Sequence, residues 1–458
     1  MSSSGSGGYR GSGLELLKRY GVSAGDAVSI STQEDETING ILMPRYESAN
    51  ENYIVVKLKS GYNTGIKVSR IKSIAKADVL AAAAAAGAAP AATHQKEDAG
   101  GSTGSSNSGG LPRVALISTG GTIASKIDYR TGGVRAALSA SELYASVPEL
   151  ASIAAVDPEV LMSEYSENLT PTHWTQIAQK VAEKVRTGAY AGVVVSHGTD
   201  TMHYTSAALS FALQKLPIPV VLVGAQRSSD RPSSDAALNL IAATAFAANA
   251  DAAGVFVAMH AGTSDDVVAV HAGTRVRKNH TSRRDAFQSI DAVPVALVRD
   301  GATIEMQEDA GVRMERRAKR ELELRPYFDS RVALVKYHPG FDPTLVYWLV
   351  SKGYGAIVFE GTGLGHVNRD LFGVLREAAE KKVHMFMTSQ CIWGRVRMTV
   401  YDTGRDLLDI GVVPLSDMIS ETAVVKAMWA LANVPQAADI KKVMQENIAG
   451  EISEAIPI

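Results

Sequence analysis

The sequence predicts an α/β protein with mostly parallel sheets, preceded by a small all-β, barrel-like domain. Three observations lead to this prediction. Apolar runs alternate with helix-like segments from residue 111 onward, short β-like runs fill residues 14–75, and an Ala/Gly/Ser-rich stretch separates the two regions. At 458 residues, the chain is long enough for two or three folded units.

The overall composition excludes several classes of protein. With 46% hydrophobic and 21% charged residues, the chain can build sizeable cores, and its net charge of −2 argues against a broadly basic surface for nucleic acid. Cys391 is the single cysteine, so no internal disulfide can form. No apolar run reaches the roughly 20 residues of a membrane helix, and no signal-peptide pattern opens the chain. We therefore expect a cytoplasmic protein without membrane contact.

The N-terminal region divides into three parts. Residues 1–13, MSSSGSGGYRGSG, are rich in Gly and Ser and are predicted to be disordered. Residues 14–75 are predicted to form the small β domain, because β-like runs recur at 27–30, 40–43, 53–58 and 66–68. Residues 76–110 change from Ala-rich to Gly/Ser-rich composition, which favours a flexible linker, with a short helix as the alternative for the alanines.

The remaining chain predicts a larger α/β domain over 111–310 and a smaller one over 311–458. Runs typical of buried strands occur at 114–118, 193–196, 220–223, 255–259, 332–335, 356–359 and 383–388. Helix-like segments occur at 172–186, 206–216, 235–248, 371–382 and 420–432. This alternation predicts parallel sheets covered on both faces, with ligands bound beyond the carboxyl ends of the strands.

Two threonine-bearing turns follow predicted strands. STGGTIAS, residues 118–125, contains two glycines that permit a tight turn and a close backbone approach, and Thr122 would project from that turn. It lacks the Lys-Ser/Thr of a phosphate-binding loop and the third glycine of a dinucleotide-binding loop. A β-turn with Thr122 capping a helix is the structural alternative. SHGTDT, residues 196–201, is the second such turn.

The side chains near these turns are suited to nucleophilic catalysis. A threonine hydroxyl is a weak nucleophile at neutral pH and requires a base and donors for an oxyanion. Thr199 and Asp200 supply a second hydroxyl and a carboxylate, and Lys278 in RVRKNHTSRRDAF, residues 275–287, supplies an amine. Each has a structural alternative, Asp200 as a helix cap and Lys278 as a solvated charge. Their joint occurrence favours a catalytic site.

In this order, STGGTIAS, SHGTDTMHYTSAAL and RVRKNHTSRRDAF resemble the signature segments of bacterial-type L-asparaginases and glutaminases. The resemblance covers about residues 112–445 and implies an asparaginase-like body of two domains. It implies that Thr122 is the nucleophile and that Tyr129, in a mobile loop, contributes to catalysis. The remaining catalytic residues would be Thr199, Asp200 and Lys278. The substrate-binding residues that it implies are Gly121, Ser166, Glu167, Thr199 and Asp200.

The identity of the general base stays open at this point. A lysine paired with an aspartate tends to remain protonated and then cannot accept a proton. Either burial opposes the pairing of Lys278 with Asp200, or Tyr129 acts as the base instead. Gly132 and Gly133 follow Tyr129 and indicate a segment that can close over substrate.

The extra N-terminal β domain distinguishes this chain from the simple asparaginases of this family. GILMPRYE (40–47) and NYIVVKLKSGYNTGIKV (52–68), joined to an asparaginase-like body, resemble the D subunits of archaeal glutamyl-tRNA(Gln) amidotransferases. The resemblance implies a glutaminase that hydrolyses L-glutamine and supplies ammonia to a partner, the E subunit, which converts Glu-tRNA(Gln) to Gln-tRNA(Gln). It further implies a homodimer within an α2β2 complex, with ATP, Mg and most contacts to tRNA(Gln) belonging to the partner. We expect no cofactor and no metal in this chain.

Two other functions remain as alternatives, a free cytoplasmic L-asparaginase and a non-catalytic binding scaffold. The added β domain disfavours the first. The joint presence of Thr122, Thr199, Asp200 and Lys278 disfavours the second, because a scaffold does not need that set. VRMERRAKRELELR, residues 312–325, mixes charges of both signs and is expected to be a solvated helical or loop face.

Overall fold

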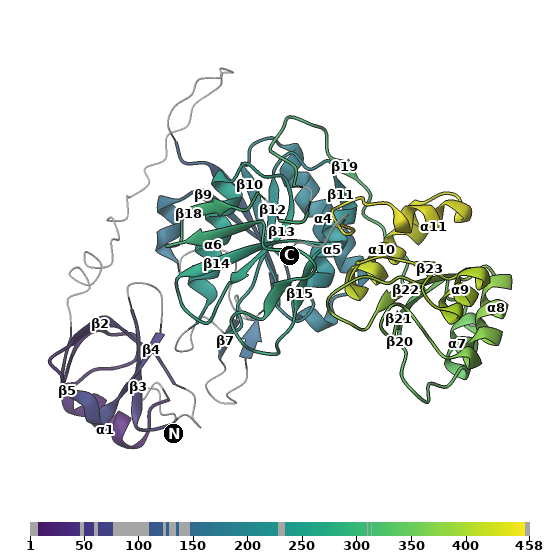
Figure 1. Ribbon diagram of the computed structural model, residues 1–458. Coiled ribbons are helices and arrows are strands. Elements are labelled where there is room, and N and C mark those ends of the chain that lie inside the picture. Colours follow the sequence, from purple (N-terminus) through teal and green to yellow (C-terminus); the bar gives the residue numbers. More distant parts are fainter. Residues whose placement is uncertain are drawn as a thin grey trace.

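A computed structural model describes residues 8–45, 50–58, 63–76, 110–121, 125–127, 134–136, 147–227, 234–308, 310–312 and 314–453. Within these residues the larger sheets are a five-stranded N-terminal sheet, an eight-stranded sheet and a four-stranded sheet (Figure 1). The last two form an α/β body of two domains, as predicted. No helix among the described residues combines the length and the apolar composition needed to cross a bilayer.

The N-terminal domain is an antiparallel sheet with one helix packed on it. The strands β1 (Ala27–Thr32), β2 (Thr37–Leu42), β3 (Tyr53–Lys57), β4 (Asn63–Lys67) and β5 (Ile71–Lys76) lie in the order β4-β3-β2-β1-β5. The short helix η1 (Val68–Arg70) connects β4 to β5. Ile30, Leu42 and Ile54 are fully buried between the sheet and helix α1 (Gly11–Tyr20). The predicted small β domain is confirmed, and α1 is an addition that the sequence did not indicate.

The start of α1 corrects the prediction of disorder over residues 1–13. Residues 9–13 belong to the folded domain, while residues 1–7 lie outside the described part of the chain. The Tyr9 ring is 3% exposed, and its hydroxyl donates to the Met43 carbonyl (2.7 Å) and accepts from the Val55 N–H (3.0 Å). One aromatic side chain within a Gly/Ser-rich stretch therefore buries enough apolar surface to order its neighbours.

The large sheet has the order β18-β17-β14-β13-β12-β10-β6-β9. Its strands are β6 (Arg113–Gly120), β9 (Ala155–Glu164), β10 (Gly192–Ser196), β12 (Pro219–Val223), β13 (Gly254–His260), β14 (Val267–Ala272), β17 (Ala296–Arg299) and β18 (Thr303–Met306). The strands from β9 to β13 are parallel, and β14, β17 and β18 are antiparallel to their neighbours. β9 was not predicted, because its residues are mostly half-buried and form no continuous apolar run.

Helices cover both faces of the large sheet, as the continuous apolar runs predicted. The helices α4 (Pro171–Arg186) and α5 (Met202–Ala212) pack on one face and α6 (Ala236–Asn249) packs on the other. Val193 and Val195 face the first layer, and Val194 faces the second. The predicted helix at 206–216 is displaced by four residues from α5. Nearly all of α5 is buried, so no polar stripe marks its ends.

The smaller domain is a parallel sheet of β20 (Val332–Lys336), β21 (Ala356–Gly361), β22 (His384–Ser389) and β23 (Val413–Pro414). The helices α7 (Thr344–Ser351), α8 (Phe372–Glu380) and α9 (Asp402–Ile410) cover one face. The helices α10 (Ser420–Asn433) and α11 (Ala437–Gln445) cover the other. Trp429 of α10 packs against Phe211 of α5, with ring centroids 5.9 Å apart. The two α/β domains therefore share one core through α5 and α10.

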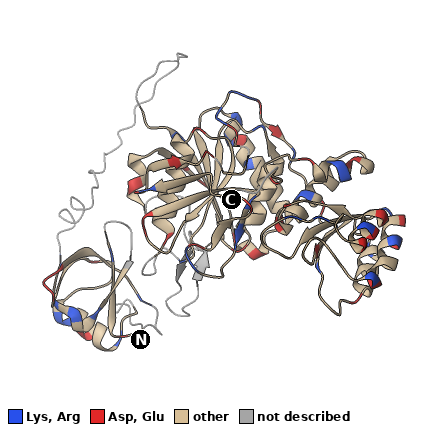
Figure 2. Ribbon diagram, in the orientation of Figure 1, with Lys and Arg blue, Asp and Glu red and all other residues tan. Residues whose placement is uncertain are grey.

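Shorter strands pair outside these sheets. They are β7 (Ser125–Ile127) with β8 (Val134–Ala136), β11 (Leu213–Gln214) with β19 (Glu323–Leu324), and β15 (Val276–Lys278) with β16 (Phe287–Ser289). The short helices η3 (Pro148–Ser152), η4 (Ser166–Asn168) and η5 (Arg369–Leu371) connect other elements. Figure 2 shows basic and acidic residues interspersed along the helices of the smaller domain.

Arg317 corrects the prediction that residues 312–325 form a solvated face. Its guanidinium is half-buried and donates to the carbonyl oxygens of Ala247 (2.8 Å), Ala250 and Ala191. Ala247 and Ala250 lie at the C-terminal end of α6, where carbonyls have no partner within the helix. Arg317 therefore caps α6. The other arginine beside it, Arg316, is exposed as expected.

Candidate active site

The segments that follow β6 and β10 meet at the point where the strand order of the large sheet reverses. β6 has β9 on one side and β10 on the other, so the next two strands that the chain adds to this sheet lie on opposite sides of β6. In α/β sheets this position forms the ligand-binding crevice. The two strand ends are tied together, because Thr119 Oγ1 donates to the Ser196 carbonyl (2.8 Å) and Ser196 Oγ donates to Ser118 Oγ (3.2 Å).

Glycines allow three loops to touch at this strand end. Gly121 has φ +84°, and a Cβ there would lie 2.3 Å from the Gly198 nitrogen. A Cβ on Gly198 would lie 2.7 Å from the Cβ of Ser166, which belongs to η4 after β9. The Thr201 hydroxyl donates to the Ser166 carbonyl (2.7 Å) and holds the third loop in place. The backbones after β6, β9 and β10 are thus in direct contact.

Lys278 brings a third part of the chain to the same place. It ends β15, and its Nζ donates to Thr199 Oγ1 (2.8 Å) and to Asp200 Oδ1 (2.7 Å). The Lys278 side chain is only 8% exposed, whereas that of Asp200 is 68% exposed. The buried amine of Lys278 is thus held between the hydroxyl of Thr199 and the accessible carboxylate of Asp200. This arrangement can position a proton relay and bind a cationic group of a ligand.

Two histidines beside this cluster are neutral at physiological pH. Burial lowers the pKa of His203 to about 3, and the charges of Arg277 and Lys278 contribute to the shift. Burial also lowers the pKa of His197 to about 4. The His197 Nδ1 lies 2.6 Å from the Gly198 carbonyl oxygen, so a proton on this nitrogen donates within the turn. His197 therefore supports the turn as a neutral ring.

The structure brings together a large part of the predicted site. The residues that converge are Gly121, Ser166, Thr199, Asp200 and Lys278. Glu167 follows in η4 and is exposed. Thr122 and Tyr129 lie outside the described residues, so their predicted roles remain predictions.

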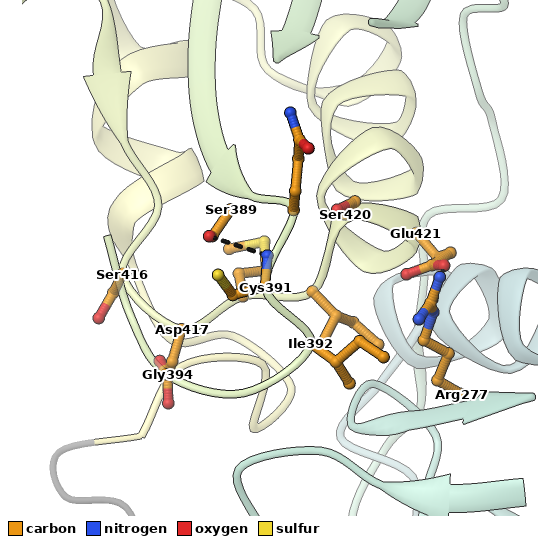
Figure 3. A pocket seen from close by; sticks show the side chains of 12 residues that line it. Arg277, Ser389, Cys391, Ile392, Gly394, Ser416, Asp417, Ser420 and Glu421 are labelled. Carbon is orange, nitrogen blue, oxygen red and sulfur yellow. Dashed lines mark hydrogen bonds and ion pairs between the residues drawn. The ribbon is translucent and has the colours of Figure 1, made fainter. Parts of the chain in front are cut away.

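Sequence reasoning missed several residues of this region. Gly198 and Thr201 join the three loops, and their contacts depend on tertiary packing that no local pattern reveals. Arg277 forms an ion pair with Glu421 at the start of α10, with 2.7 Å between Nε and Oε1 (Figure 3). A signal for Arg277 does exist, because Arg-Val-Arg-Lys, residues 275–278, would place charges on both faces of an extended segment.

Comparison with known proteins identifies the family. The family described as Asparaginase, N-terminal matches residues 113–311, and the Glutaminase/Asparaginase C-terminal domain matches residues 331–444. The GatD N-terminal domain matches residues 22–76. The D subunit of the glutamyl-tRNA(Gln) amidotransferase of Pyrococcus abyssi is 46% identical over 446 residues, which cover 96% of this chain and 97% of the relative. The chain belongs to this family of amidotransferase D subunits.

Other relatives agree with this assignment. The corresponding D subunit of Sulfolobus acidocaldarius is 45% identical over 97% of this chain and 95% of its own length. The thermostable L-asparaginase from Thermococcus kodakarensis superimposes with a TM-score of 0.66 at 34% identity, over 75% of this chain and all of that one. L-asparaginase I from Vibrio cholerae superimposes over the same shares with a TM-score of 0.65 at 27% identity. The predicted family is confirmed, and the chain is an amidohydrolase of the glutaminase/asparaginase type.

Proposed function

We propose that this chain is the glutaminase component of a tRNA-dependent amidotransferase. It hydrolyses L-glutamine and delivers ammonia to a partner, the E subunit, which converts Glu-tRNA(Gln) to Gln-tRNA(Gln). The observation that carries the chemistry is the contact of Lys278 with Thr199 and Asp200 beside the meeting point of Gly121 and Gly198. The relation to amidotransferase D subunits over nearly the whole chain supports the choice of a partner-dependent glutaminase over a free asparaginase.

The reaction begins with attack by Thr122 on the side-chain amide carbon of glutamine. Backbone N–H groups of the adjacent Gly-rich turn stabilise the negative charge on the amide oxygen. The C–N bond then breaks, the nitrogen takes up a proton, and ammonia leaves an acyl-threonine ester. Water attacks the ester, releases glutamate and returns the proton to the threonine oxygen. No other reactant is consumed.

The protons of this sequence pass through the cluster around Lys278. Thr199 Oγ1 accepts from Lys278 Nζ and has its own proton to donate toward the reacting atoms. Asp200 orients the lysine with one oxygen, and its exposed carboxylate has room to hold the ammonium group of glutamine. Ser166 and Glu167 bind the rest of the substrate, and Tyr129 is the alternative base.

Ammonia is useful only when the partner subunit is ready to transfer it to the glutamyl group. ATP and Mg would act in the E subunit to activate the glutamyl group, and the same partner would make most of the contacts to tRNA(Gln). Two copies of each polypeptide would form an α2β2 complex. A glutaminase that serves another active site wastes glutamine if it runs alone. We therefore expect low activity from this chain by itself and stimulation by the E subunit with Glu-tRNA(Gln).

Ammonia release from glutamine and from asparagine tests the proposal, with and without the E subunit and Glu-tRNA(Gln). Thr122→Ala is expected to abolish release, whereas Thr303→Ala, an exposed threonine on β18, is expected to leave it intact. Full activity of Thr122→Ala would show that the nucleophile is another group. Fast asparagine hydrolysis that ignores the partner would instead support a free asparaginase.

A further inference from the structure

Strand β15 lies between the two α/β domains, and its side chains reach both of them. Successive side chains of a strand point to opposite faces. Arg275, directly before the strand, and Arg277 face carboxylates of the smaller domain. Val276 and Lys278 face the larger domain. Lys278, which contacts the candidate catalytic Thr199, therefore directly follows Arg277, which is bound to the smaller domain.

The first contact with the smaller domain is fully buried. Arg275 Nη2 lies 3.1 Å from Asp417 Oδ2, and its other nitrogens donate to the carbonyls of Asp417 (3.1 Å) and Gly450 (3.0 Å). Burial opposes the charge of Asp417, but the Arg275 charge and the hydrogen bonds from Ser453 outweigh it and lower its pKa. The pair remains ionised and fixes the beginning of the segment.

The second contact is the ion pair between Arg277 and Glu421. Glu421 lies in the first turn of α10, where the helix dipole favours a negative charge. Next to it, the Thr422 hydroxyl donates to the Thr274 carbonyl (2.8 Å) and binds the backbone just before β15. Figure 3 shows the Arg277 and Glu421 side chains facing each other beside α10. The first turn of α10 thus holds this segment by side chain and by backbone.

On the opposite face, the same strand enters the larger domain. Val276 is fully buried in the core that also contains β10 and α5. Lys278 is the last residue of β15 and makes its two contacts with Thr199 and Asp200 there. Among the described strands, β15 pairs with β16 alone, and both have three residues. A pairing of only three residues gives the strand little stiffness. The side-chain contacts of Arg275, Arg277 and Lys278 therefore determine where the strand lies.

We propose that the Arg277–Glu421 ion pair is a positioning device for Lys278, through which the smaller domain controls turnover at the candidate active site. The inference rests on the proposed glutaminase function. Neither Arg277 nor Glu421 contacts Thr199. Together they fix the strand that carries Lys278, and a misplacement of about 1 Å at a catalytic group can cost on the order of 100-fold in rate.

The surroundings of the pair allow a clean test. Arg277 and Glu421 form part of the wall of the cavity in Figure 3, together with Ser389, Cys391 and Ile392. The Arg277 side chain is 32% exposed, so water can solvate it after its partner is neutralised. Glu421→Gln is therefore expected to fold. Arg299 and Glu305, 2.9 Å apart on β17 and β18, form an exposed ion pair that serves as the matched control.

The experiment compares kcat and KM for glutamine in the complex with the E subunit and Glu-tRNA(Gln), together with the melting temperature. Glu421→Gln is expected to lower kcat about 10-fold or more, with KM changed less than about twofold and the melting temperature within about 3 °C of the unaltered protein. Glu421→Asp, which keeps the charge, is expected to recover most of kcat. Glu305→Gln is expected to change neither constant.

Other outcomes separate this inference from the proposed function. An unchanged kcat in Glu421→Gln, alongside an inactive Thr199→Val, would overturn the positioning role alone. If Glu421→Gln does not fold, Arg277→Lys is tested in its place. For the inference to hold, the kcat of Arg277→Lys must fall while its KM stays constant. Full activity of Thr122→Ala would instead overturn the proposed threonine chemistry.

Discussion

His271 is expected to make the stability of this protein sensitive to acid. Its ring is buried on β14, with Nδ1 2.8 Å from Ser289 Oγ. Burial lowers its pKa from 6.5 to about 4. The unfolded chain takes up a proton near pH 6.5, but the folded chain does so only near pH 4. The folded state binds fewer protons in this window, so its stability must fall as the pH falls from about 6.5 to about 4.

The magnitude follows from the size of the pKa shift. For one such group, each unit by which the pH falls between the two pKa values lowers the free energy of unfolding by about 1.4 kcal/mol. Between pH 7 and pH 5, His271 alone should lower the free energy of unfolding by about 2 kcal/mol. His271→Gln keeps a polar side chain but cannot titrate in this range. The variant should therefore lose about 2 kcal/mol less than the unaltered protein between the two pH values, whatever its stability at pH 7.

Urea unfolding at pH 7 and pH 5 measures this difference. The control is His338→Gln, which makes the same replacement at a histidine that is exposed on the smaller domain. If His271→Gln loses as much free energy of unfolding as the unaltered protein does, the assignment of a buried neutral ring at this position is wrong.

Two further predictions concern a close backbone contact and a buried ion pair. Gly198→Ala should reduce both the melting temperature and glutamine turnover, because its Cβ would lie 2.7 Å from that of Ser166. Gly373→Ala in α8 should reduce neither, because no atom beyond its own helix backbone and its chain neighbours lies within 4 Å of the added methyl group. Equal reductions in the two variants would contradict the close contact at Gly198. Glu451→Gln should lower the free energy of unfolding by about 3–5 kcal/mol, because Lys426 is fully buried and would lose its charged partner. A loss below about 1 kcal/mol in urea unfolding would contradict that account.

Much of the fold could be predicted because the central strands are buried on both faces. Their residues read as continuous apolar runs, and β10 and β12 appear within a residue or two of their predicted ends. Two elements gave a weaker signal for different reasons: β9 is mostly half-buried and has no continuous apolar run, and α5 is buried almost throughout, so no polar stripe marks its ends. Helix α1 escaped prediction because its order depends on one tyrosine whose partners lie more than thirty residues away.

The candidate site was predictable only in part. Local sequence placed Thr199 and Asp200 at the end of a buried strand, which is where α/β sheets bind ligands. The contact of Lys278 with Thr199 spans 79 residues. Their residue types favoured a shared catalytic site and the resemblance to asparaginases implied one, but no local pattern gives the contact itself. The pairing of Arg277 with Glu421 spans 144 residues and depends on how the two domains pack. No local pattern contains that information.

The two-sided anchoring of β15 limits how this protein can be recombined with its relatives. The smaller domain looks like a module that could be exchanged, because it has its own sheet and helices. A chimera that replaced it would also replace Asp417 and Glu421, which hold Arg275 and Arg277 of the recipient. Such a hybrid would need matching carboxylates at both positions, and a donor without them could yield a folded protein with a misplaced lysine.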